Sequence, residues 1–215
     1  NGSLYYTLTG EKTAAELVLP TRMENLKAIP ADLDLAGSEM VVAQSDSHMT
    51  QLRDAFAPLR DSGEYDYALL DCPPSLGLIM TNALVAADEI LMPIQCEYYA
   101  LEGLSTLMLV INQIREAANP GLAISGMVMT MYDSRTNLNQ AVVRDVREHF
   151  EDVVYDTIIP RTIRLGEAPS FGRTIFEHDP QGNGAEAYSK LGDEFLARQA
   201  SGKRFVSPAA VLAEP

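Results

Sequence analysis

The feature that most constrains the fold is a regular exchange of short apolar runs with stretches of helical periodicity. Residues 67–70 read Tyr-Ala-Leu-Leu, a continuous apolar run that is typical of a strand buried on both faces of a parallel sheet. The predicted strands are 26–29, 67–70, 89–94, 122–130 and 153–159. The predicted helices are 13–19, 35–44, 48–60, 78–87, 103–118, 137–150 and 184–198. This alternation predicts an α/β fold with a doubly wound, mostly parallel sheet and helices on both faces.

Length and composition fit one globular domain. The chain has 215 residues, of which 47% are apolar and 21% charged, so it can bury a core and is neither a polyelectrolyte nor a fibrous repeat. We expect one domain over residues 1–199. The amphipathic period stops there, which predicts a flexible tail over residues 200–215.

Charge and hydropathy exclude several classes of protein. The longest apolar runs are far shorter than the roughly 20 residues that cross a bilayer, so no membrane contact is expected. The chain begins at Asn1 without the pattern of a secretory signal, and we expect a cytoplasmic, truncated protein. A net charge of −14 argues against nucleic-acid binding through net charge, although a local basic face could still bind.

Cysteine and histidine do not form a metal or redox motif. Cys72 and Cys96 are too far apart for a CxxC pair, and both are expected to be buried, reduced thiols. His48, His149 and His178 fall in different predicted elements, so we propose no metal ligation by them.

Polar side chains follow the predicted strands. Ligands bind outside the carboxyl ends of the strands in an open parallel sheet. Asp71, Glu97, Asp133 and Arg161 each stand at or just beyond such an end, so we expect them at one rim.

Asp71 begins a loop with two possible roles. A carboxylate here could hold magnesium or the attacking water of a nucleotide hydrolase, or it could be a turn or N-cap residue. Pro73 and Pro74 fix an extended backbone and Gly77 lets the chain turn into the next helix. That loop could report on a phosphate, or it could be a stiff connection.

The sequence contains no GxxxxGK[ST] phosphate loop and no GxGxxG fingerprint. This is the main obstacle to an ATPase assignment from the residues alone. The best basic stretch is 158–175, with Arg161, Arg164 and Arg173 against Glu167. With Arg144 and Arg147 from the preceding predicted helix, it could form a face for nucleic-acid phosphates, or these could be solvated surface arginines.

Several long motifs resemble the ParA/Soj chromosome-partitioning ATPases, which have a deviant phosphate loop. They are YDYALLDCPPSLG at 65–77, PIQCEYYALEGL at 93–104, DSRTNL at 133–138, IPR at 159–161 and LGEAPSFG at 165–172. The segments 29–37 and 179–188 fit the same family, so the resemblance runs in order to about Leu196.

The resemblance implies a P-loop fold and an ATPase that binds ATP and Mg²⁺, dimerises around two nucleotides and binds nucleoid DNA without sequence preference. It also implies stimulation by a ParB-type centromere-binding partner. Asp71 matches the aspartate near magnesium and the attacking water, and Glu97 to Gly103 matches a segment near the dimer interface. The other implied nucleotide-binding residues are Pro73, Pro74 and Gly77, which sense the γ-phosphate, and Thr130, Met131, Pro160 and Arg161, which pack around the adenine.

Two departures qualify the resemblance. The family's first strand and KGGVGKT-like loop should precede Asn1, so we expect this chain alone to bind ATP weakly and to be inactive. Basic residues that relatives often carry are replaced by Glu151 and Gln181. DNA binding would then depend on Arg144, Arg147 and Arg164, with Arg161 or residues elsewhere as further candidates. A P-loop-less regulatory or binding remnant and a MinD-type positioning ATPase are the alternatives, and plasmid or chromosomal cargo is open.

Overall fold

The structure is a computed structural model that describes residues 2–45 and 47–205. The chain divides into two compact units, one of residues 1–88 and 111–122 and the other of residues 89–110 and 123–215. We call these the first and the second unit. The single domain expected over residues 1–199 stays a prediction.

The second unit contains a three-stranded parallel sheet in the order β3-β4-β5. Its strands are β3 (Glu89–Gln95), β4 (Ala123–Tyr132) and β5 (Val154–Pro160), close to the predicted ranges. The central strand β4 is apolar and buried from Ala123 to Met129, as expected for a strand covered on both faces. This confirms the predicted α/β class with a parallel sheet.

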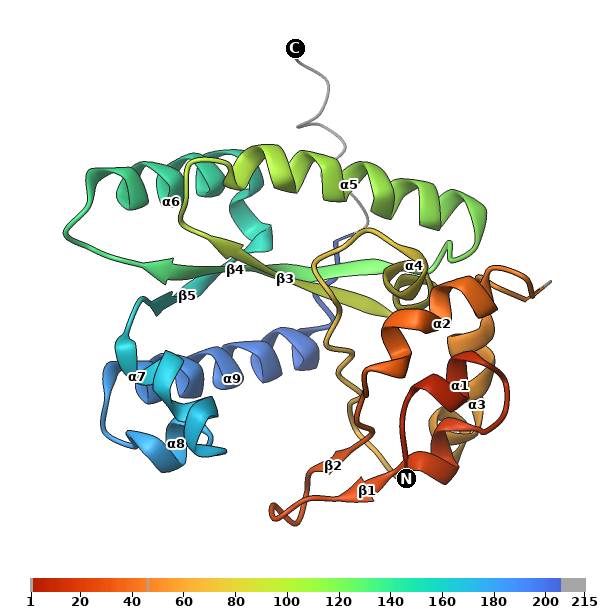
Figure 1. Cartoon of the computed structure of the whole chain (residues 1–215). Coiled ribbons are helices and arrows are strands. Elements are labelled where there is room, and N and C mark those ends of the chain that lie inside the picture. Colours follow the sequence, from red (N-terminus) through yellow and green to blue (C-terminus); the bar gives the residue numbers. More distant parts are fainter. Residues whose placement is uncertain (1, 46, 206–215) are drawn as a thin grey trace. The chain divides into compact units, whose positions relative to one another are not determined.

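Helices cover both faces of this sheet. Figure 1 shows α6 (Asn137–Phe150) on one face and α9 (Asn183–Ser201) on the other. Val142, Val143 and Val146 recur at helical spacing and form the buried stripe of α6. On the other face, Val128, Tyr155 and Ile159 pack against Ala187 of α9. The shorter elements of this unit are η2 (Glu151–Val153), α7 (Ile163–Glu167), η3 (Ala168–Phe171) and α8 (Ile175–His178).

The first unit is mainly helical around a small apolar core. Its elements are α1 (Tyr5–Leu8), η1 (Ala14–Leu17), α2 (Asp34–Val42), α3 (Gln51–Ser62) and α4 (Leu78–Ala86), with the antiparallel pair β1 (Leu19–Pro20) and β2 (Lys27–Ala28). Leu8, Val42, Leu52, Ala83 and Ala86 form the core. The helix α5 (Ala100–Ala117) begins in the second unit and ends in the first.

Three predicted elements of the first unit differ from the structure. The strand predicted at 67–70 is an extended segment that pairs with no described strand, and Leu69 is 85% exposed. A strand is defined by the hydrogen bonds it shares with a neighbour, so an apolar run without such a neighbour does not become one. The predicted strand 26–29 shortens to β2, and the predicted helix 13–19 becomes η1 followed by β1.

The end of the second unit is ordered further than predicted. The helix α9 runs to Ser201, and Phe205 exchanges backbone hydrogen bonds of 2.9 and 3.1 Å with Ile124. Arg204 Nε lies 2.6 Å from Glu89 Oε1. The first six residues of the predicted tail are therefore placed, and residues 206–215 lie outside the described part. Within residues 2–45 and 47–205, no helix is both long and apolar enough to cross a membrane.

Candidate functional site

The carboxyl ends of β3, β4 and β5 form a rim in the second unit. The backbone N–H of Arg161 donates to Tyr132 O at 2.8 Å, which joins the residue after β5 to the end of β4. The guanidinium of Arg161 lies 3.6 Å from the Glu97 carboxylate, measured from Nη1 to Oε1. Glu97, Asp133 and Arg161 gather at this rim as predicted. Asp71 belongs to the first unit, and its place at the same rim stays a prediction.

Met131 gives this rim an unusual backbone. Its φ is +55°, in the left-handed region that non-glycine residues seldom adopt. Such conformations are held by their surroundings and cluster at ligand sites. The side chain is 41% exposed, while the neighbouring Thr130 hydroxyl donates to Ile94 O at 3.2 Å. Tyr132 is in register with Pro160, so the four residues Thr130, Met131, Pro160 and Arg161 lie together at the ends of β4 and β5.

Asn139 was missed by the sequence reasoning. Its side chain accepts from Asp133 N at 2.7 Å and donates to Cys96 O at 2.5 Å, which joins the ends of β4 and β3. It is 7% exposed and shares the buried face of α6 with Val142 and Val143. An asparagine on the apolar face of an amphipathic helix is the signal that could have indicated it, because a buried amide needs partners.

The carboxylate of Asp133 accepts hydrogen bonds from Arg135 in its own loop. The Arg135 guanidinium donates to both carboxylate oxygens, at 2.9 and 2.7 Å, and the Arg135 backbone N–H donates at 3.0 Å. The side-chain hydrogen bonds from Arg135, followed by that backbone bond, lower the pKa of Asp133 to about 2. The carboxylate therefore stabilises the turn that leads into α6, where Thr136 caps the helix.

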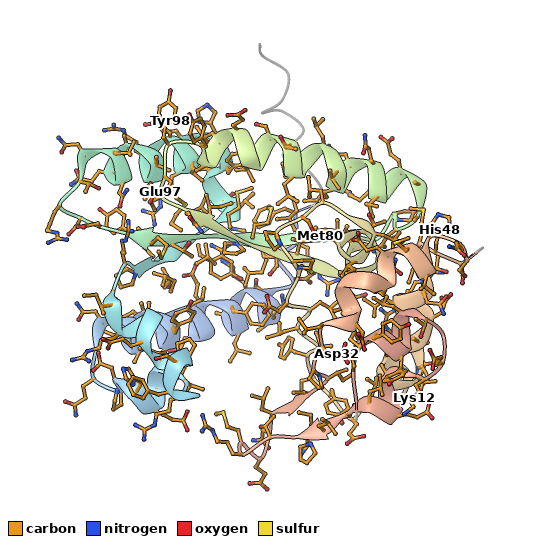
Figure 2. The ribbon with its side chains drawn as sticks, viewed as in Figure 1. Lys12, Asp32, His48, Met80, Glu97 and Tyr98 are labelled. Atoms are coloured by element: carbon orange, nitrogen blue, oxygen red, sulfur yellow. The ribbon has the colours of Figure 1, made fainter. Side chains whose placement is uncertain are left out.

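The turn between β3 and α5 carries exposed aromatic side chains. Figure 2 shows Glu97 and Tyr98 at this turn. The rings of Tyr98 and Tyr99 meet edge to face, with centroids 5.0 Å apart, and both are exposed. The predicted role of Glu97 to Gly103 near a dimer interface stays a prediction. Beneath the turn, burial raises the pKa of the Cys96 thiol to about 11, with the Glu97 charge adding to the effect.

Asp71 lies in the first unit on the extended segment that leads to α4. The carboxylate is exposed, and Pro73, Pro74 and Gly77 follow it before the helix. Burial, with the Asp71 charge adding to it, raises the pKa of the half-buried Cys72 thiol. Both cysteines are free thiols, but only Cys96 is fully buried, so the expected burial of Cys72 was partly wrong. The described residues contain no cluster of three His, Cys, Asp or Glu side chains that could hold a metal.

Gly77 stands before α4 and faces a carboxylate. The backbone N–H of Ile79, in the first turn of α4, donates to Glu39 Oε1 at 3.4 Å. A methyl group on Gly77 would overlap that same oxygen. Glu39 comes from α2, so the absence of a side chain at Gly77 allows α2 and the start of α4 to meet through a favourable charge at a helix N-terminus.

The predicted DNA-binding arginines lie at two places in the second unit. Arg147 donates to Asp156 O at 3.1 Å near the amino end of β5. Arg164 follows the carboxyl end of β5 and pairs with Glu167 at 3.0 Å. Asp156 lies four residues before the end of β5, a span of about 13 Å, so Arg147 and Arg164 mark two places along this strand. Their predicted role as one face for nucleic-acid phosphates stays a prediction. Arg144 is exposed and, among the described residues, makes no ion pair.

The sequence is similar to chromosome-partitioning proteins. A family model described as an AAA domain matches residues 1–124. The chromosome partitioning protein ParA of Caulobacter vibrioides is 45% identical over 197 residues, which cover 92% of this chain and 74% of that protein. The sporulation initiation inhibitor protein Soj of Bacillus subtilis is 43% identical over 194 residues, covering 90% of this chain and 76% of its own.

Solved structures share the fold. Cobyrinic acid a,c-diamide synthase from Mycobacterium smegmatis, solved with an ATP analog and magnesium, has a TM-score of 0.77 and 31% identity, with 94% of this chain and 75% of that chain covered. The cell division ATPase MinD from Pyrococcus furiosus has a TM-score of 0.71 over 91% of this chain and 75% of its own, at 24% identity. At that identity the likeness to MinD shows the fold alone. With the synthase at 31% identity, it supports the predicted P-loop NTPase-like fold.

Proposed function

Because the chain belongs to the ParA/Soj family of chromosome-partitioning proteins, we propose that it is an ATPase that segregates chromosomal or plasmid DNA. The observation that carries this proposal is the rim of the second unit. There, a left-handed Met131 lies beside Thr130, Pro160 and Arg161, the residues that the family motif assigns to the adenine. Backbone held in an unfavourable conformation at the carboxyl end of a parallel sheet is typical of a ligand loop.

Asp71 is proposed to orient the attacking water and to hold Mg²⁺. Its exposed carboxylate fits the chemistry, because Mg²⁺ in phosphoryl-transfer sites is bound by one or two carboxylates together with phosphate oxygens and water. The metal would neutralise negative charge on the phosphates. Pro73 and Pro74 remove two backbone donors and restrict the loop, and Gly77 joins it to α4, so a shift of this loop would be passed to the helix.

The test compares Asp71→Ala with Asp66→Ala in the protein expressed from its complete reading frame, because these 215 residues contain no phosphate-loop motif. Both aspartates are exposed and lie on the same connection between α3 and α4, so Asp66→Ala is a matched control. We expect Asp71→Ala to lower kcat about a hundredfold while ATP affinity changes little, since losing a positioned carboxylate acts on the chemical step. Equal kcat in both variants would contradict a role of Asp71 in hydrolysis and would indicate that it only forms the turn.

The remaining parts of the proposal concern partners. As a nucleoid-associated cytoplasmic protein, the homodimer would bind non-specific DNA through Arg164 at one patch and through Arg144 and Arg147 at the other. A ParB-type centromere-binding protein would stimulate hydrolysis, and the Glu97 to Gly103 turn would lie near the dimer interface. We expect the 215 residues alone to bind ATP weakly, because adenine contacts do not replace charge-assisted bonds to the phosphates. Micromolar binding of MgATP to this chain in calorimetry would contradict that expectation.

A further inference from the structure

The buried side chain of Asn139 connects the ends of two strands through hydrogen bonds. Its amide oxygen accepts from Asp133 N at 2.7 Å and its amide nitrogen donates to Cys96 O at 2.5 Å. Its own backbone N–H donates to the Thr136 hydroxyl at 3.4 Å, within the first turn of α6. One residue on α6 therefore fixes the turn after β3 and the turn after β4.

These hydrogen bonds lie next to Met131, the rim residue with a left-handed backbone. Asp133 is two residues after Met131, whose φ is +55°. Between them, Tyr132 O accepts from Arg161 N at 2.8 Å, so the segment 131–133 is held from β5 on one side and from α6 on the other. A left-handed non-glycine residue persists only where its surroundings hold it. Asn139 supplies one of the two anchors.

Removing this amide would leave two backbone groups without partners. Asn139 is 7% exposed and Cys96 is fully buried, so water has little access to Cys96 O. Buried donors and acceptors without a partner are costly, and the backbone moves to find new ones. The segment that would move contains Met131 and adjoins Glu97.

We propose that Asn139 is a positioning residue that fixes the base-binding loop of the nucleotide site and thereby sets its preference for adenine over guanine. The inference rests on the proposed function. ATP and GTP carry the same ribose and phosphates, so only the base loop distinguishes them. Sites that recognise a base edge by hydrogen bonds need those groups in fixed positions, because a buried polar group left without its partner costs binding free energy.

The test uses the protein expressed from its complete reading frame and measures Kd for MgATP and for MgGTP by calorimetry. The variants are Asn139→Leu, which removes both side-chain bonds, and Asn139→Asp, which keeps the acceptor for Asp133 N and loses the donor to Cys96 O. The matched control is Asn82→Leu in α4. Asn82 is also buried, and it accepts from Leu52 N at 3.2 Å and donates to His48 O at 2.6 Å, all within the first unit.

We expect Asn139→Leu to weaken ATP binding about tenfold or more and GTP binding less than twofold, so that the preference for ATP falls by at least fivefold. Asn139→Asp should lower the same preference by a smaller factor, and it provides the answer if Asn139→Leu does not fold. Asn82→Leu should lower the melting temperature and leave the preference unchanged.

An unchanged ATP-to-GTP preference in folded Asn139 variants, with normal ATP binding by the unsubstituted protein, would overturn this inference and leave the proposed function standing. An equal loss of preference in Asn82→Leu would also overturn it, because the effect would then follow from lost stability. If the unsubstituted protein bound no ATP, the proposed function itself would fail, and this inference with it.

Discussion

Cys96 and Asn139 are neighbouring residues that act on the rim in different ways. The Asn139 side chain accepts and donates hydrogen bonds. The Cys96 thiol is fully buried at the end of β3, where it is neutral. Its pKa is raised to about 11 from an ordinary value of 9.0, by burial first and by the Glu97 charge second. The folded state therefore favours the protonated thiol.

This shift predicts how stability depends on pH. A group whose pKa is raised in the folded state contributes stability that is present below its unfolded pKa and is lost as pH rises toward the folded value. We expect the urea midpoint of the second unit to fall between about pH 9 and pH 11. In Cys96→Ala, which lacks the thiol, the urea midpoint should fall less over this pH range. An identical pH profile in Cys96→Ala would contradict the assignment.

Side chains of single residues were the least predictable part of the site. The sequence motif placed Met131 at the rim but could not indicate its left-handed backbone, because nothing in a methionine favours φ of +55°. Asn139 could have been indicated by its place on the apolar face of α6. Its two partners could not, because Asp133 lies 6 residues and Cys96 43 residues before it in the sequence. Pairing of that kind follows from tertiary packing.

At the scale of elements, the contact between α2 and α4 depends on Glu39 and Gly77. Glu39 accepts the Ile79 N–H at the start of α4, an end that has no acidic residue in its first turn. The carboxylate thus stabilises the helix that follows the Asp71 loop.

A double-mutant cycle tests this contact. Gly77→Ala should destabilise the first unit by about 1 kcal/mol, because the added methyl group displaces the carboxylate and its bond to Ile79 N–H. In a Glu39→Ala background the same change should cost much less, so the two effects are not additive. Gly37→Ala on α2 is the control, since a methyl group there meets open space and should stabilise by about 0.5 kcal/mol. Additive effects of Gly77→Ala and Glu39→Ala in urea unfolding would contradict the contact.

The elements of the second unit were more predictable than those of the first. The ranges of β3, β4, β5 and α6 follow from long apolar runs and a clear 3.6-residue period, which persist whatever the partners are. The extended segment at 67–70 has the same apolar character, yet it forms no strand, because strand formation requires a neighbour with matching backbone groups. The short elements α7, η3 and α8 were not predicted, since each is too brief to show a period.

At the scale of the whole molecule, charge is the main constraint on partners. A net charge of −14 opposes approach to DNA at long range. At 0.15 M salt the screening length is about 8 Å, so a local patch of arginines acts almost independently of distant carboxylates. Arg164 is already paired with Glu167, and DNA phosphates would have to compete with that carboxylate.

The most direct test of the account is the affinity for non-specific DNA of the protein expressed from its complete reading frame, measured with MgATP and with MgADP over a series of salt concentrations. We predict tight binding with ATP only, without sequence preference, and a slope of log K against log salt of several units, at about −0.9 for each neutralised phosphate. Arg164→Glu should reduce this slope and the affinity for all sequences. Arg53→Glu, at a partly exposed arginine paired with Asp54, should change neither. Binding that is equal with ATP and ADP, or absent with both, would contradict the claim that this chain is part of an ATP-dependent DNA segregation protein.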